Sequence, residues 1–164
     1  MQDHLLEQLT LVDIKPEDRE LAITLIGNIN EDGYFTGSLP DIIMISDRSE
    51  SDVLGVLKVI QSFAPPGVGA RTLRECLLQQ LEGIEDSPWE DEARLVIDKY
   101  LEKLGAHDEK HLCKVLNLTR DELNHVIALI RSLNPRPGRA FEAADTEYVE
   151  PEVFVVKEKG RFVA

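Results

Sequence analysis

Aromatic residues are scarce in this sequence, which has one Trp, three Tyr and five Phe among its 164 residues. A core with so few rings must consist mainly of Leu, Ile and Val, as the cores of helical bundles do. Cysteine is also rare, since only Cys76 and Cys113 occur, on separate predicted helices. Two such residues suit a reducing cytoplasm better than a disulfide scaffold. We therefore expect a helical protein of the cytoplasm.

Basic residues and long apolar runs are the other shortages. The 18 Lys and Arg residues face 31 Asp and Glu residues, which gives a net charge of −13. Because phosphate neutralisation supplies most of the affinity of a nucleic-acid-binding surface, an acidic surface should repel DNA. No apolar run approaches the roughly 20 residues of a membrane span, and the N-terminus has no basic and then apolar signal sequence. Protein partners are therefore favoured over DNA or a membrane.

Apolar residues at helical spacing are abundant along most of the chain. The first half predicts four helices: one capped by Asp3 that runs to Leu9, one from Pro16 that ends at Asn30 or Gly33, one from Pro40 to Ile45, and one that begins with a capping box of Ser49 and Asp52. The residues predicted to be buried on these helices are Leu5, Leu6, Leu9, Leu21, Ala22, Leu25, Ile26, Ile29, Val53, Val56, Leu57, Ile60 and Phe63.

The second half repeats this pattern about 70 residues later. Its helices are predicted to begin at Thr72, at Ser87-Pro88, near Asp108 and at Thr119, where Glu122 completes a second capping box. The predicted buried residues are Leu95, Val96, Tyr100, Leu101 and Leu104 on a helix that Gly105 ends, and Leu123, Val126, Ile127, Ile130 and Leu133 on the last helix. Two related units explain the match, and so does a chance similarity between two amphipathic bundles.

A proline- and glycine-rich segment separates the two halves. The helical pattern stops at Pro65, because proline has no N–H and disfavours helical geometry in the residue before it. Pro66-Gly67 suits a turn in which glycine takes a positive φ, and Gly69 adds a second permissive position. Thr72 and Glu75 then restart a helix as a capping box. The segment is either a stiff pivot between two bundles or a simple connector.

The fold class that follows is all-α. We expect two small bundles of about four helices each, with helix-turn-helix-like pairs, and a short C-terminal β-hairpin from the alternation of Val153, Val155 and Phe162 around Lys159-Gly160. The predicted divisions are residues 1–66, residues 67–138 and an extended segment with the start of the hairpin at 139–164. The sequence stops at Val163-Ala164 within a predicted strand, with no cap or turn after it, so we expect the chain to be a fragment of a longer protein.

No arrangement of residues predicts an active site, a cofactor or a metal. His107 and His111 are four residues apart near Asp108 and Cys113, but Cys113 lies about 200° around the helix from His111, and zinc needs three or four convergent ligands. The glycines of the 67–69 segment precede a helix without the Gly-Lys-Ser/Thr of a phosphate loop. A small helical enzyme is therefore disfavoured.

Two groups of charges have alternative interpretations. Arg71 and Arg74 either hold an acidic partner or pair locally with Glu75. The acidic run from Glu82 to Glu92 is either a solvated linker or a docking edge for a basic patch on a partner.

The run Pro65-Pro66-Gly67-Val68-Gly69-Ala70-Arg71, followed by Leu73-Arg74-Glu75-Cys76-Leu77-Leu78 and Gln80-Leu81, resembles the core-binding region of bacterial sigma-54 factors. Asp32-Gly33-Tyr34 upstream and Asn134-Pro135-Arg136-Pro137-Gly138 downstream fall in the order that this family shows. Ala64 departs from the acidic residue expected before the double proline. The resemblance covers most of the chain.

The resemblance implies a domain that docks a transcription initiation factor onto core RNA polymerase in bacterial cytoplasm. The partner-binding residues that it implies are Pro65, Pro66, Gly67, Val68, Gly69, Arg71, Leu73, Arg74 and Glu75. Promoter DNA and an ATP-dependent activator would be bound through regions absent from this chain, and a monomer without cofactor, metal or enzymatic activity is expected. The alternative is an acidic helix-turn-helix DNA-binding or protein-interaction domain of a transcription regulator.

Overall fold

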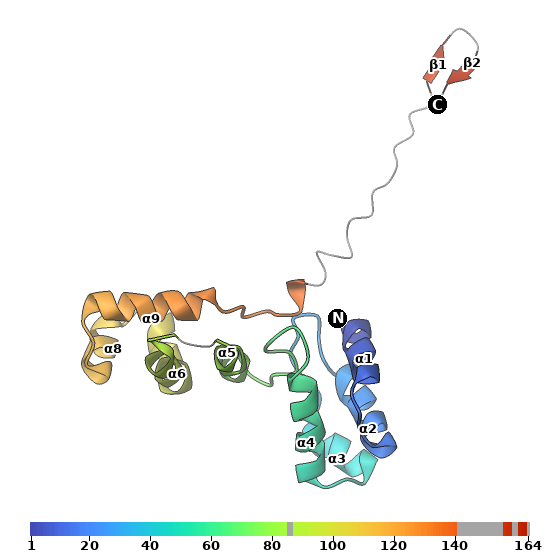
Figure 1. Cartoon of the computed structure of the whole chain (residues 1–164), viewed down its shortest axis with the longest axis horizontal. Helices are drawn as coiled ribbons and strands as arrows, with labels where there is room; N and C mark the ends of the chain where they lie inside the picture. The colour runs from blue at the N-terminus through green and yellow to red at the C-terminus, as the bar shows by residue number, and fades with distance from the viewer. Residues whose placement is uncertain (85–86, 141–155, 159–160, 164) are drawn as a thin grey trace.

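Every segment in which the apolar spacing predicts a helix contains one in the residues that the structure describes. The structure is a computed structural model that describes residues 1–84, 87–140, 156–158 and 161–163. The first group of helices in Figure 1 contains α1 (Gln2–Leu11), α2 (Pro16–Gly27), α3 (Leu39–Ser46) and α4 (Glu50–Gln61). The second group contains α5 (Leu73–Glu82), α6 (Glu90–Lys99), α7 (Leu101–Gly105), α8 (Glu109–Leu116) and α9 (Arg120–Ser132).

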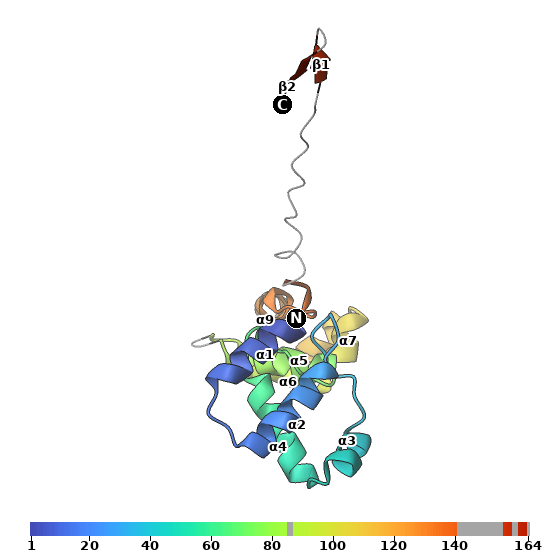
Figure 2. The same ribbon diagram turned by 90° about the vertical axis from the view of Figure 1, so that its right-hand side faces the viewer.

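The first group is held together by apolar residues from all four of its helices. Helix α2 packs against α1 and α4, and α3 packs against α4 at the edge of the group (Figure 2). Fully buried Leu and Ile side chains contribute roughly 1.5–3 kcal/mol each. Helices of 8 to 12 residues are marginal in isolation, so this burial holds them. The buried cluster is Leu5, Leu9, Leu21, Ala22, Leu25, Ile26, Ile29, Phe35, Ile42, Val53, Val56, Leu57, Ile60, Phe63 and Val68.

The second group buries two separate clusters. In the larger one, α6 packs between α5 and α9, and in the smaller one α8 packs against α9 and α7. The larger cluster contains Leu77, Leu81, Ala93, Val96, Ile97, Val126, Ile130 and Leu133, and the smaller one Leu112, Leu123 and Ile127. All five residues predicted to be buried on the last helix are therefore buried.

The pairs α3–α4 and α8–α9 are joined by the same local geometry. Asp47 and Asn117 end α3 and α8 in the left-handed conformation, with φ of 53° and 54°. Ser49 and Thr119 then begin α4 and α9, each with both hydrogen bonds of a capping box. The short side chains of Asp and Asn favour the left-handed conformation, and those of Ser and Thr favour the start of a helix, because they bond nearby backbone groups. The two capping boxes predicted from the sequence are therefore confirmed.

Two predicted boundaries in the first group are wrong. Helix α1 begins at Gln2, so Asp3 lies in its first turn and does not cap it. Helix α2 ends at Gly27 and reaches neither Asn30 nor Gly33. The carbonyl of Asn28 accepts a hydrogen bond from the Thr36 N–H at 2.9 Å, so the chain leaves the helix to pair with a later segment. Ile29 is still buried, beyond the helix end.

The predicted helix from Ser87-Pro88 to Gly105 is also wrong in its bounds. The Ser87 hydroxyl accepts from the Trp89 N–H in a turn, and α6 begins only at Glu90. Tyr100 has φ of −125°, which breaks the helix and separates α6 from α7. Consequently the face of α6 that is buried consists of Ala93, Val96 and Ile97. Leu95, Tyr100, Leu101 and Leu104 are only half-buried.

The all-α prediction is confirmed for the helical part that the structure describes. Strand β1 (Val156–Glu158) pairs antiparallel with β2 (Arg161–Val163). The predicted hairpin stays a prediction, because its turn and the segment from 141 to 155 lie outside the described residues. None of the helices in the described ranges is long and apolar enough to cross a bilayer.

Candidate functional site

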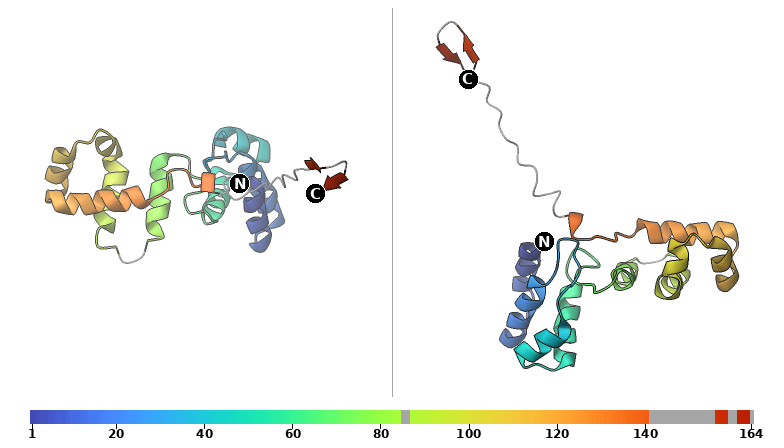
Figure 3. Two further views of the ribbon diagram at one scale, coloured as in Figure 1. Left: turned by 90° about the horizontal axis from the view of Figure 1, so that it is seen from above. Right: turned by 180° about the vertical axis from the view of Figure 1, so that it is seen from behind.

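Three segments that are far apart in the sequence meet between the two groups of helices. They are residues 30–36, residues 62–72 and residues 133–139, and we call their meeting point the junction. The segment after α9 returns past α5 to reach the first group (Figures 1 and 3). The three motifs around Gly33, Gly67 and Gly138 that suggested the family resemblance therefore lie together.

Backbone hydrogen bonds join the three segments of the junction directly. The Gly69 N–H donates to the Gly33 carbonyl at 2.8 Å, and the Phe35 N–H donates to the Ala70 carbonyl at 2.9 Å. The Gly138 N–H donates to the Asp32 carbonyl at 3.0 Å. Residues 30–36 therefore contact both of the other segments. The pairing fixes the position of the 62–72 loop relative to the segment after α9.

Glycine is required at several positions of the junction, and the tightest is Gly138, where a Cβ would overlap the Glu31 carbonyl. Gly67 has φ of +90°, and a Cβ there would lie 2.7 Å from Gln80 Nε2 and 2.8 Å from Cys76 Sγ. Gly69 has φ of +73°. The prediction of positive φ at these two glycines is therefore confirmed. Residues with a side chain rarely adopt this backbone conformation.

Amide side chains complete the junction. Gln80 donates to the Asn134 carbonyl at 2.7 Å and accepts from the Asn134 N–H at 2.7 Å. Gln8 bonds both backbone groups of Ala64 in the same way, at 2.8 Å and 2.7 Å. Gln61 donates to the Gly69 carbonyl at 3.0 Å. Each amide satisfies loop backbone groups that no helix or strand could pair.

Tyr34 ties the first segment to the third. Its hydroxyl donates to the Pro135 carbonyl at 2.7 Å. Burial, assisted by the neighbouring Cys76, raises the pKa of Tyr34 to about 12. The phenol therefore stays protonated, and keeps its donor, at any physiological pH. Arg139 adds a bond from its Nε to Asp32 Oδ1 at 2.6 Å.

Arg71 and Glu75 form a local ion pair at the start of α5. Arg71 Nε lies 3.0 Å from Glu75 Oε2, and the Arg71 N–H donates to the same oxygen at 2.8 Å. Thr72 accepts from the Glu75 N–H, but the carboxylate bonds Arg71 where a capping box would bond Thr72. Burial raises the pKa of Glu75, yet the hydrogen bonds from Arg71 and Gln61 outweigh it and lower the pKa below its usual value.

A groove lies beside the junction, between α4 and α5. Its volume is about 940 Å³, and Pro66, Gly67, Arg71, Arg74 and Glu75 of the predicted partner-binding set line it. The remaining walls are Lys58, Gln61, Ser62, Phe63, Thr72, Leu78, Gln79, Glu82 and Gly83. The junction thus forms one end of a groove in which a segment of a partner could bind.

The comparison with known families agrees with this geometry. A family described as the sigma-54 factor core binding domain matches residues 1–164. The chain belongs to this family. It is 40% identical to the RNA polymerase sigma-54 factor of Pseudomonas aeruginosa (strain UCBPP-PA14) over 168 residues, which is 99% of this chain and 34% of that protein.

Other sigma-54 factors give the same result. The identity is 42% to that of Azotobacter vinelandii and 40% to that of Escherichia coli (strain K12), with 99% of this chain and 34% and 35% of those proteins covered. The chain therefore spans about a third of the length of the curated relatives that it matches.

The nine predicted partner-binding residues of this core binding domain divide into three groups by their exposure. Gly67, Val68 and Gly69 are buried, so they mainly shape the loop, and of these three only Gly67 also lines the groove. Pro65 and Glu75 are half-buried. The exposed members are Pro66, Arg71, Leu73 and Arg74.

Sequence reasoning missed the amides and Tyr34 as parts of the junction. Gln80 bonds a residue 54 positions later, and Tyr34 a residue 101 positions later. A local pattern cannot encode such partners. The weak signal that was present is the position of Gln61 directly after the apolar stripe of α4, beside the proline-rich loop.

The other candidate groups have partners of their own. The ring of His111 lies edge-on to Tyr100 with centroids 6.2 Å apart, and no group of three His, Cys, Asp or Glu residues converges within the described ranges.

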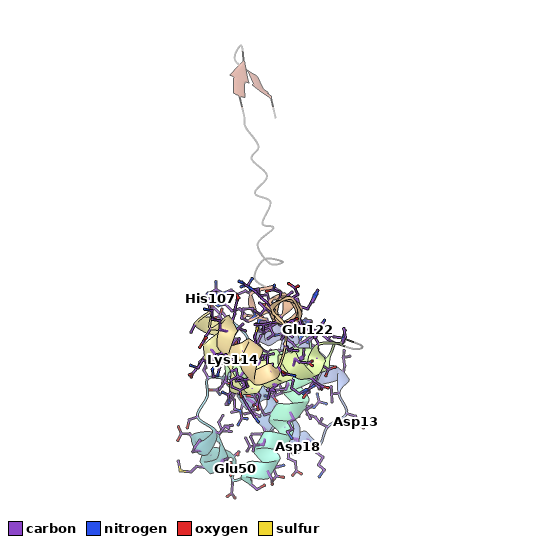
Figure 4. All side chains as sticks on the ribbon, turned by 90° about the vertical axis from the view of Figure 1, so that its left-hand side faces the viewer. Asp13, Asp18, Glu50, His107, Lys114 and Glu122 are labelled. Atoms are coloured by element: carbon purple, nitrogen blue, oxygen red, sulfur yellow. The ribbon has the colours of Figure 1, made fainter. Side chains whose placement is uncertain are left out.

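Arg94 lies 3.8 Å from Glu82 and 2.8 Å from Glu90, so the acidic run is partly neutralised by a cation from α6. Figure 4 shows Lys114 and His107 on the second group, and Asp13 and Glu50 on the first.

Proposed function

We propose that this chain docks a sigma-54-type initiation factor onto core RNA polymerase. The observation that carries the proposal is the family match over residues 1–164, because that family is described as a core binding domain. The net charge of −13 supports a protein partner, since an acidic chain is repelled by nucleic acid. Promoter DNA and an ATP-dependent activator are then bound by other parts of a longer protein, and this part acts as a monomer in bacterial cytoplasm.

The docking unit is two bundles, residues 1–66 and 67–138, with a C-terminal hairpin after them. The first buried cluster reaches Val68, the second begins at Leu77 and the third at Leu112, which supports a division in the loop between α4 and α5. The junction bonds this loop to residues 30–36 and 133–139. A polymerase that contacts both bundles therefore meets them at a set angle.

Size-exclusion chromatography with bacterial core RNA polymerase tests the function. The purified chain should elute with the polymerase at micromolar concentration, and a full-length sigma-54 factor should displace it. A folded chain that elutes alone would contradict the proposal. Circular dichroism of the same sample establishes that the chain is folded.

The alternative function is a helix-turn-helix domain that binds DNA or protein. The repeated geometry of α3–α4 and α8–α9 favours it, and Lys110, Lys114 and Arg120 are exposed on the second pair. A gel shift with random duplex DNA separates the two functions. Tight binding that weakens steeply with salt would favour the alternative.

A further inference from the structure

The groove between α4 and α5 differs in charge from the chain as a whole. Its cationic lining residues are Lys58, Arg71 and Arg74, and its acidic ones are Glu75 and Glu82. The whole chain has 31 acidic residues against 18 basic ones. Three basic and two acidic residues give the lining a net charge of +1, whereas the whole chain has a net charge of −13.

Two of the three cations in the groove are not used by the fold. Arg71 is paired with Glu75, and Glu82 lies 3.8 Å from Arg94. Lys58 and Arg74 are exposed and form no ion pair with the described residues. The position of Arg74 is informative, because it lies in the first turn of α5, where the helix dipole is unfavourable to a positive charge. A negative partner at this place would offset that repulsion.

The floor of the groove can bind an apolar group between these charges. Phe63 and Leu78 line it, and Pro66 is an exposed apolar wall. Gln79 also lines the groove, and its Oε1 is buried and accepts no hydrogen bond from the described part of the chain. A buried acceptor without a donor is costly. The backbone N–H of a bound segment could supply the donor only after the Gln79 side chain has rotated to expose Oε1 to the groove.

We propose that the groove receives an acidic segment of core RNA polymerase. Carboxylates of the segment lie against Lys58 and Arg74, and an apolar side chain between them lies against Phe63 and Leu78. The proposal rests on the proposed polymerase-binding function and names the chemistry of the polymerase surface that this site recognises. It follows from charge complementarity, because two unpaired cations select for acids.

Charge reversal tests the groove. The affinity of the purified chain for core polymerase is measured by fluorescence anisotropy at several salt concentrations, with Arg74→Glu and Lys58→Glu as variants. Each variant should raise Kd at low salt by about tenfold or more, and should make the salt dependence shallower. Arg74→Lys should retain most of the affinity. Lys114→Glu makes the same charge change on α8, outside the groove, and should change Kd by less than about twofold.

The outcomes separate the groove from the function. If the native chain does not bind the polymerase, the proposed function fails. If it binds and both groove variants bind equally well while folded, the groove inference alone is overturned. A photoactivatable residue in place of Lys58 identifies the occupant, because the cross-linked polymerase peptide should be rich in Asp and Glu. A cross-link to a basic peptide, or to a second copy of this chain, would overturn the inference.

Discussion

Replacement of Gly67 by alanine tests whether the junction depends on this glycine. The φ of +90° at Gly67 costs any other residue about 1–2 kcal/mol. The new Cβ would also lie 2.7 Å from Gln80 Nε2 and 3.1 Å from the Cys76 carbonyl. The Gln80 side chain can move away, but the α5 backbone at Cys76 cannot.

Movement of Gln80 has its own cost. It gives up the two hydrogen bonds to the backbone of Asn134, each worth about 0.5–1 kcal/mol. With the backbone strain, Gly67→Ala should lower the free energy of unfolding by about 2–4 kcal/mol. At roughly 2–4 °C per kcal/mol for a chain of this size, the Tm should fall by about 4–16 °C.

Two other glycines serve as matched controls in urea unfolding followed by circular dichroism. Gly69 has a comparable φ of +73°, but the nearest atom to its Cβ would be Gln61 Cγ at 3.3 Å, so Gly69→Ala should cost about 1–2 kcal/mol. Gly55 is exposed within α4 and has nothing within 4 Å, so Gly55→Ala should stabilise the chain by about 0.5–1 kcal/mol.

The ranking of the three variants is the decisive result. If Gly67→Ala is as stable as Gly69→Ala, the close approach of the loop to α5 is not a source of stability. If Gly67→Ala unfolds at lower urea and also binds polymerase more weakly at temperatures where it is folded, the junction fixes the docking geometry as well as the fold.

Three further predictions concern single side chains. Tyr34→Phe loses the hydrogen bond to the Pro135 carbonyl and should lower the free energy of unfolding by about 1 kcal/mol. In an absorbance titration of this variant, the phenolate that forms near pH 12 in the native chain should be missing, and its persistence would refute the assignment of that pKa to Tyr34. Ser49→Ala removes the cap of α4 and should cost about 1 kcal/mol in urea unfolding, so an unchanged midpoint would contradict the cap. Because the pKa of Glu75 is lowered on folding, its carboxylate stabilises the chain above about pH 4.5, and this stabilisation is lost as the pH falls through the folded pKa. Glu75→Gln should therefore be less stable than the native chain at pH 7, and the difference should shrink as the pH falls below about 4.5; a constant difference would exclude the linkage.

The sequence predicted most of the helices and their caps because both are local features. Ser49 and Thr119 reach backbone groups three residues away, and the apolar stripe of α4 recurs within every turn. The break at Tyr100 was missed, because the helical spacing of apolar residues continues through it. After the break α7 packs against α8, a tertiary contact that the spacing does not contain.

The candidate site was predicted in part. The motif residues from 65 to 75 were named from the family resemblance, but their division into buried and exposed members depends on the three-dimensional junction. For Arg71, the predicted local pair with Glu75 is confirmed. The two residues are four positions apart at the start of α5, so a local pattern is enough to predict the pair. For Arg74, the partner interpretation remains a prediction, now attached to a defined groove.

The junction has a consequence for the order in which the molecule matures on the ribosome. Helices α1 to α4 share a buried cluster that needs nothing beyond Val68, so they can pack while the rest is still being translated. The backbone bond from Gly138 to Asp32, by contrast, exists only after Gly138 has left the exit tunnel. A nascent chain can therefore pack its first group of helices early, whereas the junction is complete only late, and a partner that requires the complete junction would not bind before then.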